Sequence, residues 1–188
     1  MAVRTFLAID LDGAILDRLE AAQKSLDDGA SKVNWVARPN VHLTLNFLGD
    51  VPDEILSDVC AIAAGAAAKV EPFEIEVAGV VAMPPRGPLR MFWAGVNDPT
   101  GRLAALQDGL AVSLTGLRLR QEERAFKPHI TLARVKFARN PAQLRQSAAA
   151  LAAQEFGIQH VEEVVAYASR LTSDGPIYTP IARAKLGK

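Results

Sequence analysis

Two of the three histidines in the chain open the same four-residue pattern. Residues 42–45 read His-Leu-Thr-Leu, and residues 129–132 read His-Ile-Thr-Leu. The chain has seven Thr and 21 Leu among 188 residues, so chance places Thr at +2 and Leu at +3 of a given His with a probability of about 0.004. Chance gives two such matches among three His about once in ten thousand sequences or less often. We therefore interpret the two segments as matching halves of one site.

The residue types in this pattern suit the cleavage of a phosphoester by acid–base chemistry. A neutral imidazole takes a proton from the attacking water or hydroxyl, and a protonated one gives a proton to the leaving oxygen. The unperturbed pKa of imidazole lies near neutrality, which suits both roles. Threonine hydroxyls donate hydrogen bonds to the phosphate oxygens, where charge builds in the transition state. We expect His42 and His129 to be catalytic and Thr44 and Thr131 to bind the phosphate.

The two-residue spacing predicts how these side chains are presented. In a β-strand, residues i and i+2 point to the same face. His42 and Thr44 would therefore project together, as would His129 and Thr131, while the intervening Leu43 points into the core. A rigid strand of this kind holds a catalytic pair in place.

Two other interpretations compete with this one. A strand His beside a Thr is usually a polar, partly buried pair, and for either motif alone that interpretation would be preferred. A zinc site usually needs three or four ligands, and no carboxylate or Cys ligand set lies near the two motifs in the sequence. The third histidine, His160, lacks the pattern and is interpreted as a surface or structural residue.

The elements that position the motifs alternate along the chain. Short loops join several of the strands, which favours an α+β fold with antiparallel pairing over a parallel doubly wound sheet. The two motifs lie 87 residues apart, which suggests two similar lobes. Helices are expected from Asp12 to Gly29, over 52–70, from Pro99, and from Asn140. Strands are expected over 3–11, 35–37 (a short strand or an extended segment), 41–48, 73–82, 90–96, 117–120, 129–135, 156–170 (one long strand or a bent pair) and 178–186.

Composition excludes several classes of protein. The 188 residues suit one compact domain or two small lobes, and the formal net charge of zero gives no global attraction for a long nucleic acid. The single Cys60 excludes an internal disulfide, and its apolar neighbours predict a core position on a helix.

The N-terminal apolar run is neither a signal peptide nor a membrane span. A cytoplasmic location is the default expectation.

The paired motifs resemble those of the 2H phosphoesterase superfamily. More narrowly, the chain is similar to bacterial and archaeal RNA 2′,3′-cyclic phosphodiesterases, also described as 2′-5′ RNA ligases. The resemblance spans nearly the whole chain. Its segments are residues 4–9, 40–49, 90–96, 126–134, 169–171 and 175–178.

This resemblance implies one domain over residues 1–188, built from two interleaved lobes with one motif each. It implies two antiparallel sheets with outer helices, related by a pseudo-two-fold axis around a central cleft. The implied reaction is hydrolysis of a terminal RNA 2′,3′-cyclic phosphate to a 2′-phosphate, with a reverse 2′-5′ ligation. No metal or nucleotide cofactor is expected. The expected partner is an RNA end with a cyclic phosphate, such as a tRNA-derived end, or a cyclic nucleotide, with no membrane and no obligate protein partner.

Two further residues share a position relative to the histidines. Phe47 and Arg134 both lie at +5, a place that the resemblance associates with holding the terminal base between an aromatic ring and a guanidinium. In an ideal strand an odd offset points away from the His, so a bulge or a strand end would have to re-aim both side chains. Phe47 is equally well interpreted as a core residue. Trp93 and Tyr178 are interpreted as structural.

The direction of proton transfer is not fixed by symmetric motifs. We assign His129 as the base that activates water and His42 as the acid for the 3′ oxygen. Cleavage of another small cyclic or 2′-5′ phosphodiester, or ligation as the physiological direction, is an alternative within the same superfamily. An RNA-end binding module without turnover is an alternative of a different class, and the intact His and Thr positions argue against it.

Overall fold

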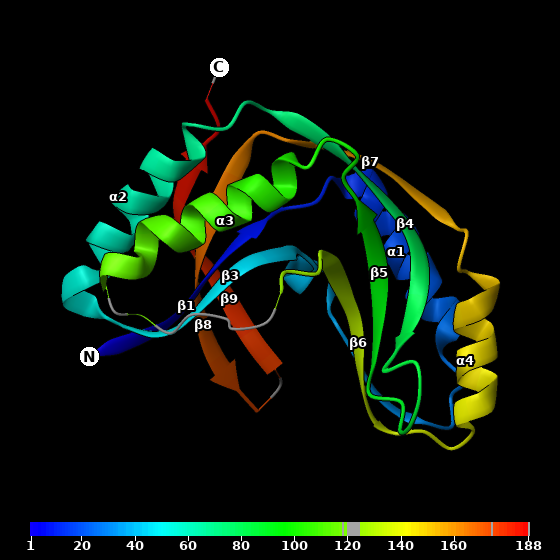
Figure 1. Cartoon of the computed structure of the whole chain (residues 1–188). Coiled ribbons are helices and arrows are strands. Elements are labelled where there is room, and N and C mark those ends of the chain that lie inside the picture. Colours follow the sequence, from blue (N-terminus) through cyan, green and yellow to red (C-terminus); the bar gives the residue numbers. More distant parts are fainter. Residues whose placement is uncertain (118, 120–124, 174, 188) are drawn as a thin grey trace.

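The computed structural model describes residues 1–117, 119, 125–173 and 175–187. These residues form helices and antiparallel strands, which confirms the α+β class (Figure 1). The helices are α1 (Gly13–Leu26), α2 (Leu56–Ala67), α3 (Arg102–Leu114) and α4 (Pro141–Ala150). The strands are β1 (Ala2–Ile9), β2 (Lys32–Trp35), β3 (Leu43–Pro52), β4 (Phe73–Met83), β5 (Met91–Asn97), β6 (His129–Phe137), β7 (Glu155–Val161), β8 (Glu163–Thr172) and β9 (Gly175–Lys185).

The described strands form one connected sheet in the order β7-β4-β5-β6-β3-β1-β8-β9, with β2 paired to β6. Strands β3 and β6 meet through the single pair Leu43–Ile130. We call the strands β7, β4, β5, β6 and β2 the β6 half, and β3, β1, β8 and β9 the β3 half. The family resemblance implied two antiparallel sheets, which these halves represent. The structure joins the two halves at this one residue pair. Beyond it, β6 pairs with β5 and β3 pairs with β1.

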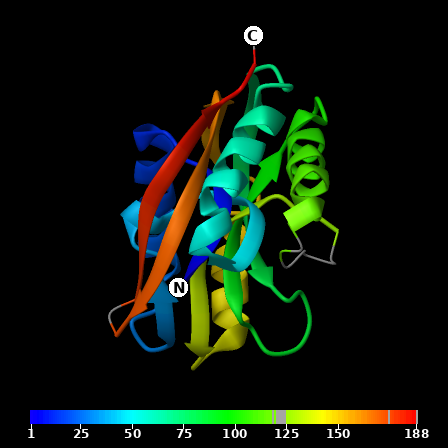
Figure 2. The same ribbon diagram turned by 90° about the vertical axis from the view of Figure 1, so that its left-hand side faces the viewer.

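Each half carries its own pair of helices. Helices α1 and α4 pack against β7 and β4 of the β6 half, on the right in Figure 1, and α2 and α3 lie over the β3 half, on the left. Figure 2 shows α2 between α3 on one side and the strands β8 and β9 on the other. The apolar face of α3 is a row of leucines at helical spacing, all buried. They are Leu103, Leu106, Leu110 and Leu114.

Two expected elements differ from the structure, and the segment 156–170 adopts the second of its two expected forms. The strand expected over 35–37 is β2, which ends at Trp35, because a 3-10 turn (η1, Arg38–Asn40) follows. The strand expected over 117–120 begins in a 3-10 turn (η3, Thr115–Leu117), and Arg118 and Arg120 lie outside the described residues. The segment 156–170 is a pair of strands that separate at Glu162, because β7 pairs with β4 and β8 pairs with β1.

The second and fourth expected helices begin as the sequence signals indicate. The helix expected from residue 52 starts as a 3-10 turn (η2, Asp53–Ile55) and continues as α2. The Asn140 side chain accepts a hydrogen bond from the Gln143 backbone N–H at 3.1 Å, which caps α4. Cys60 lies half-buried on α2 and packs against the core, as expected. Within the described ranges, no helix is both long and apolar enough to span a membrane.

Candidate active site

The two motif strands present their histidines and threonines on one face. Leu43 and Ile130 are fully buried, whereas the residues on both sides of each are half-exposed. Because β3 and β6 run antiparallel through the Leu43–Ile130 pair, the positions of His42 and Thr131 lie opposite each other, as do those of Thr44 and His129. The +2 spacing therefore places the side chains as predicted. The junction of the two halves brings all four together.

Both imidazoles are held by the same kind of backbone contact. His42 Nδ1 lies 2.8 Å from the carbonyl oxygen of Asn40, and His129 Nδ1 lies 2.7 Å from that of Lys127. A carbonyl oxygen only accepts, so Nδ1 carries the proton and donates it in both rings. Each neutral ring then has its lone pair on Nε2, which in His42 lies 3.0 Å from Thr44 Oγ1. Nε2 is the nitrogen available for proton transfer on both strands.

Aromatic rings fix the orientation of each histidine. The Phe6 ring stacks on His42 with centroids 4.8 Å apart, and Tyr178 meets His42 edge-on at 5.4 Å. On the other strand, Trp93 stacks on His129 at 3.9 Å with 24° between the ring planes. Burial in its cluster lowers the pKa of His42, because desolvation disfavours the charged ring.

Trp93 and Tyr178 are half-buried and lie outside the apolar core. Both were interpreted as structural from the sequence, yet each contacts a motif histidine. Phe6 was missed as well. Trp93 reaches His129 because β5 pairs with β6, and Phe6 reaches His42 because β1 pairs with β3. No spacing along the chain signals these contacts, since they join strands that are distant in sequence.

Matching β-bulges re-aim the two +5 residues. On β3, Leu7 pairs with Asn46 while Ala8 pairs with Thr44, so one residue of β3 is extra. On β6, Phe92 pairs with Ala133 while Trp93 pairs with Thr131, which leaves Leu132 extra. An extra residue shifts the in–out alternation by one position.

The burial pattern follows these bulges. On both strands the +3 and +4 residues are buried, and the +5 residue returns to the surface. Phe47 is half-buried and Arg134 is exposed, on the face that carries the histidines. Of the two devices expected to re-aim the +5 side chains, a bulge or a strand end, the structure has a bulge at the same place in both motifs.

Charged groups surround the His42 side of the site. The guanidinium of Arg4 lies over the Phe47 ring, 4.7 Å from its centroid. Burial raises the pKa of the Tyr178 hydroxyl, and the positive charges of Arg134 and Arg4 partly offset that rise. The Tyr167 ring lies 5.3 Å from that of Phe6 and 6.4 Å from that of His42, and its hydroxyl donates a hydrogen bond of 2.6 Å to Asp10. The site therefore combines two imidazoles, two hydroxyls and nearby guanidinium groups, which are donors suited to an anionic phosphate.

A metal centre has no counterpart among the residues described. In that part of the chain, no group of three or more His, Cys, Asp or Glu side chains is placed to hold a metal ion. His160 is a surface residue, as expected, and its Nε2 lies 3.4 Å from Glu162.

Comparisons with known proteins agree with this arrangement. The LigT-like phosphoesterase profile matches residues 9–93 and 95–178, two segments that each contain one His-x-Thr motif. An RNA 2′,3′-cyclic phosphodiesterase from Methanothermobacter thermautotrophicus is 36% identical over 179 residues, covering 95% of this chain and 96% of its own length.

Two solved structures share the whole fold. TT0787 from Thermus thermophilus has a TM-score of 0.84 at 30% identity, covering 98% of this chain and 99% of its own. E. coli LigT complexed with 3′-AMP has a TM-score of 0.82 at 25% identity, with full coverage of both chains. With a family profile matched over most of its length and a relative this similar, the chain belongs to the LigT-like phosphoesterase family.

Proposed function

We propose that this protein hydrolyses terminal RNA 2′,3′-cyclic phosphates to 2′-phosphates by two-histidine acid–base catalysis. The observation that carries the proposal is the single pairing of β3 with β6, because it sets two His-x-Thr strands against each other with their reactive faces shared. The name of the M. thermautotrophicus relative supports the choice of substrate. E. coli LigT in its 3′-AMP complex supports recognition of a nucleotide.

In the proposed reaction, water attacks phosphorus and the bond from phosphorus to the 3′ oxygen breaks. His129 Nε2 takes a proton from the water, and protonated His42 gives its Nε2 proton to the departing 3′ oxygen. Thr44 and Thr131 donate hydrogen bonds to the non-bridging oxygens as charge builds there. The product keeps its phosphate on the 2′ oxygen, and exchange with solvent restores the two imidazoles.

The acid role of His42 depends on the bound substrate. Burial lowers the pKa of His42 in the empty site, which favours the neutral ring. An anionic phosphate beside Nε2 favours the imidazolium and raises that pKa. The negative charge of Asp10 acts in the same direction. Substrate binding therefore favours protonated His42, which then donates its proton to the 3′ oxygen.

The remaining parts of the proposal extend what the family resemblance implies. Phe47 and Arg134 hold the terminal base from the two bulged strands by stacking and cation contact. The reaction runs without a metal ion. A 5′-hydroxyl of a second RNA in place of water gives a 2′-5′ linkage through the same proton transfers. RNA ends in the cytoplasm, such as those derived from tRNA, are the proposed substrates, and no obligate protein partner is required.

One assay tests the leaving group and the metal independence together. The protein is incubated with 2′,3′-cyclic AMP, with and without EDTA, and the product is identified by phosphorus NMR. We expect 2′-AMP alone, formed at the same rate in both samples. Formation of 3′-AMP would mean that the bond from phosphorus to the 2′ oxygen breaks instead. Inhibition by EDTA would overturn metal independence. Binding of the nucleotide without turnover would instead favour the RNA-end binding module.

A further inference from the structure

We propose that a pocket next to Phe47 binds the nucleotide on the 5′ side of the cyclic end, so that the preferred substrate is an RNA chain and not a mononucleotide. This inference rests on the proposed function. It adds a second subsite to the reaction centre and names the class of molecule that fills it.

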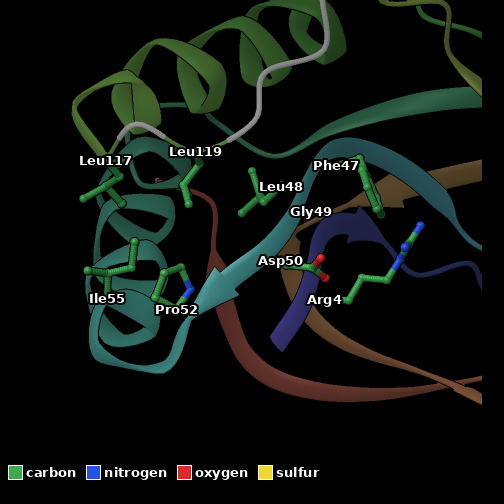
Figure 3. Close-up of a pocket in the computed structure, with 9 residues that line it drawn as sticks. All are labelled: Arg4, Phe47, Leu48, Gly49, Asp50, Pro52, Ile55, Leu117 and Leu119. Carbon is green, nitrogen blue, oxygen red and sulfur yellow. The ribbon is translucent and has the colours of Figure 1, made fainter. Parts of the chain in front are cut away.

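The pocket lies along β3, beyond the motif residues. Its volume is about 340 Å³, within the range of small-ligand pockets. Figure 3 shows Arg4 and Phe47 at one end and the apolar side chains at the other, with Asp50 between them. The lining residues are Arg4, Phe47, Leu48, Gly49, Asp50, Pro52, Ile55, Leu117 and Leu119.

Phe47 belongs to both the site and the pocket. It follows Thr44 on the same strand and returns to the face of His42 after the bulge. Because β3 has one extra residue before Phe47 and another directly after it, Thr44, Phe47 and Asp50 pair with Ala8, Phe6 and Arg4 of β1. Each step is thus two residues of strand rise, roughly 7 Å. A chain whose cyclic phosphate lies at Thr44 and whose terminal base reaches Phe47 therefore continues into the pocket.

The chemistry of the lining fits a nucleotide. Leu117, Leu119 and Ile55 offer apolar surface for the face of a base. The Arg4 guanidinium is held on the Phe47 ring, and its N–H groups can donate to the phosphodiester that joins the last two nucleotides. The Asp50 carboxylate accepts from the exocyclic amine of adenine, cytosine or guanine. The pocket thus supplies stacking surface, a cation for the linkage and an acceptor for the base edge.

The test compares two substrates on three proteins. The substrates are 2′,3′-cyclic AMP and the dinucleotide ApA ending in a 2′,3′-cyclic phosphate. The proteins are the wild type, Leu117→Trp, which fills the pocket, and Val112→Trp, a matched control at an exposed position of α3 outside the pocket. For the wild type we expect kcat/KM to be about tenfold higher for the dinucleotide, the size of one base-stacking contact. In Leu117→Trp the ratio of the two values falls toward one, and in Val112→Trp it stays at the wild-type value.

A second variant, Arg4→Ala, tests the contact with the linkage. We expect Arg4→Ala to lower kcat/KM for the dinucleotide by a larger factor than for the mononucleotide. In the wild type, added salt should lower the ratio of the two kcat/KM values, because it screens the contact between Arg4 and the phosphodiester. Equal kcat/KM for both substrates in the wild type, or an unchanged ratio in Leu117→Trp, would overturn the subsite while leaving the proposed function intact. Failure of the wild type to cleave either substrate would instead overturn the proposed function.

Discussion

Leu43 and Ile130 form the single residue pair through which β3 meets β6, and neither side chain is exposed to solvent. Each lies directly between the His and the Thr of its motif. The apolar faces of the two motif strands therefore join the halves of the molecule, while the polar faces form the candidate site. The same contact therefore packs the two halves together and places the reactive groups.

Truncation at this pair should damage both stability and activity. Leu43→Ala is expected to cost about 2–5 kcal/mol of unfolding free energy, as for other buried leucines, and to lower kcat because the two motifs are no longer held in register. Leu110→Ala, at an equally buried position on α3, is the matched control. Urea unfolding and steady-state kinetics on both variants provide the measurement. If Leu110→Ala lowers kcat as much as Leu43→Ala, the junction has no special role in the site.

Removal of either motif imidazole should abolish most of the turnover. His42→Ala and His129→Ala are each expected to lower kcat about 10²- to 10⁴-fold, the usual contribution of one general acid or base. The surface variant His160→Ala is the control and should keep wild-type activity. Hydrolysis of 2′,3′-cyclic AMP is the assay. Full activity in either motif variant would be incompatible with two-histidine catalysis.

The buried state of His42 predicts a pH dependence of stability. Its pKa in the folded protein lies below the ordinary value of 6.5, so the unfolded chain binds this proton more tightly. The stability gained from a neutral His42 is fully present above the unfolded pKa and is lost as pH falls through the folded pKa. Unfolding free energies of the wild type and of His42→Gln, measured by urea between about pH 7.5 and pH 5, test the sign. The wild type should lose more stability than the variant.

The same group should respond to ligand. Binding of 2′-AMP, the proposed product, should raise the pKa of His42, because the phosphate anion favours the imidazolium. Titration of the imidazole carbon protons by NMR, with and without 2′-AMP, measures this shift. An unchanged or lowered His42 pKa in the complex would argue against His42 as the acid.

The bulged +5 residues should affect nucleotide binding more than proton transfer. Phe47→Ala and Arg134→Ala are each expected to raise KM for 2′,3′-cyclic AMP, by about 5- to 150-fold if each loses a base contact of roughly 1–3 kcal/mol. Phe47→Tyr keeps the ring and should retain most of the affinity. A fall in kcat with KM unchanged would place these residues in the chemical step instead.

The sequence by itself determined the family, the α+β class and the faces of the two motifs. A strand repeats every two residues, so the His-x-Thr spacing fixes which side chains share a face without any knowledge of the neighbouring strands. The leucine spacing of α3 and the Asn-Pro start of α4 are equally local and were predicted correctly. The single-domain boundary and the catalytic roles of His42 and His129 stay predictions.

Only the tertiary structure decided how the two halves meet and what surrounds each histidine. The Leu43–Ile130 pair, the Trp93 ring on His129 and the bulges before Phe47 and Arg134 all depend on hydrogen bonds between strands far apart in the chain. The sequence showed that the +5 side chains needed a bulge or a strand end, but not that β3 and β6 both carry a bulge. Register between distant strands is set by packing across the sheet, and no periodicity along a single strand records it.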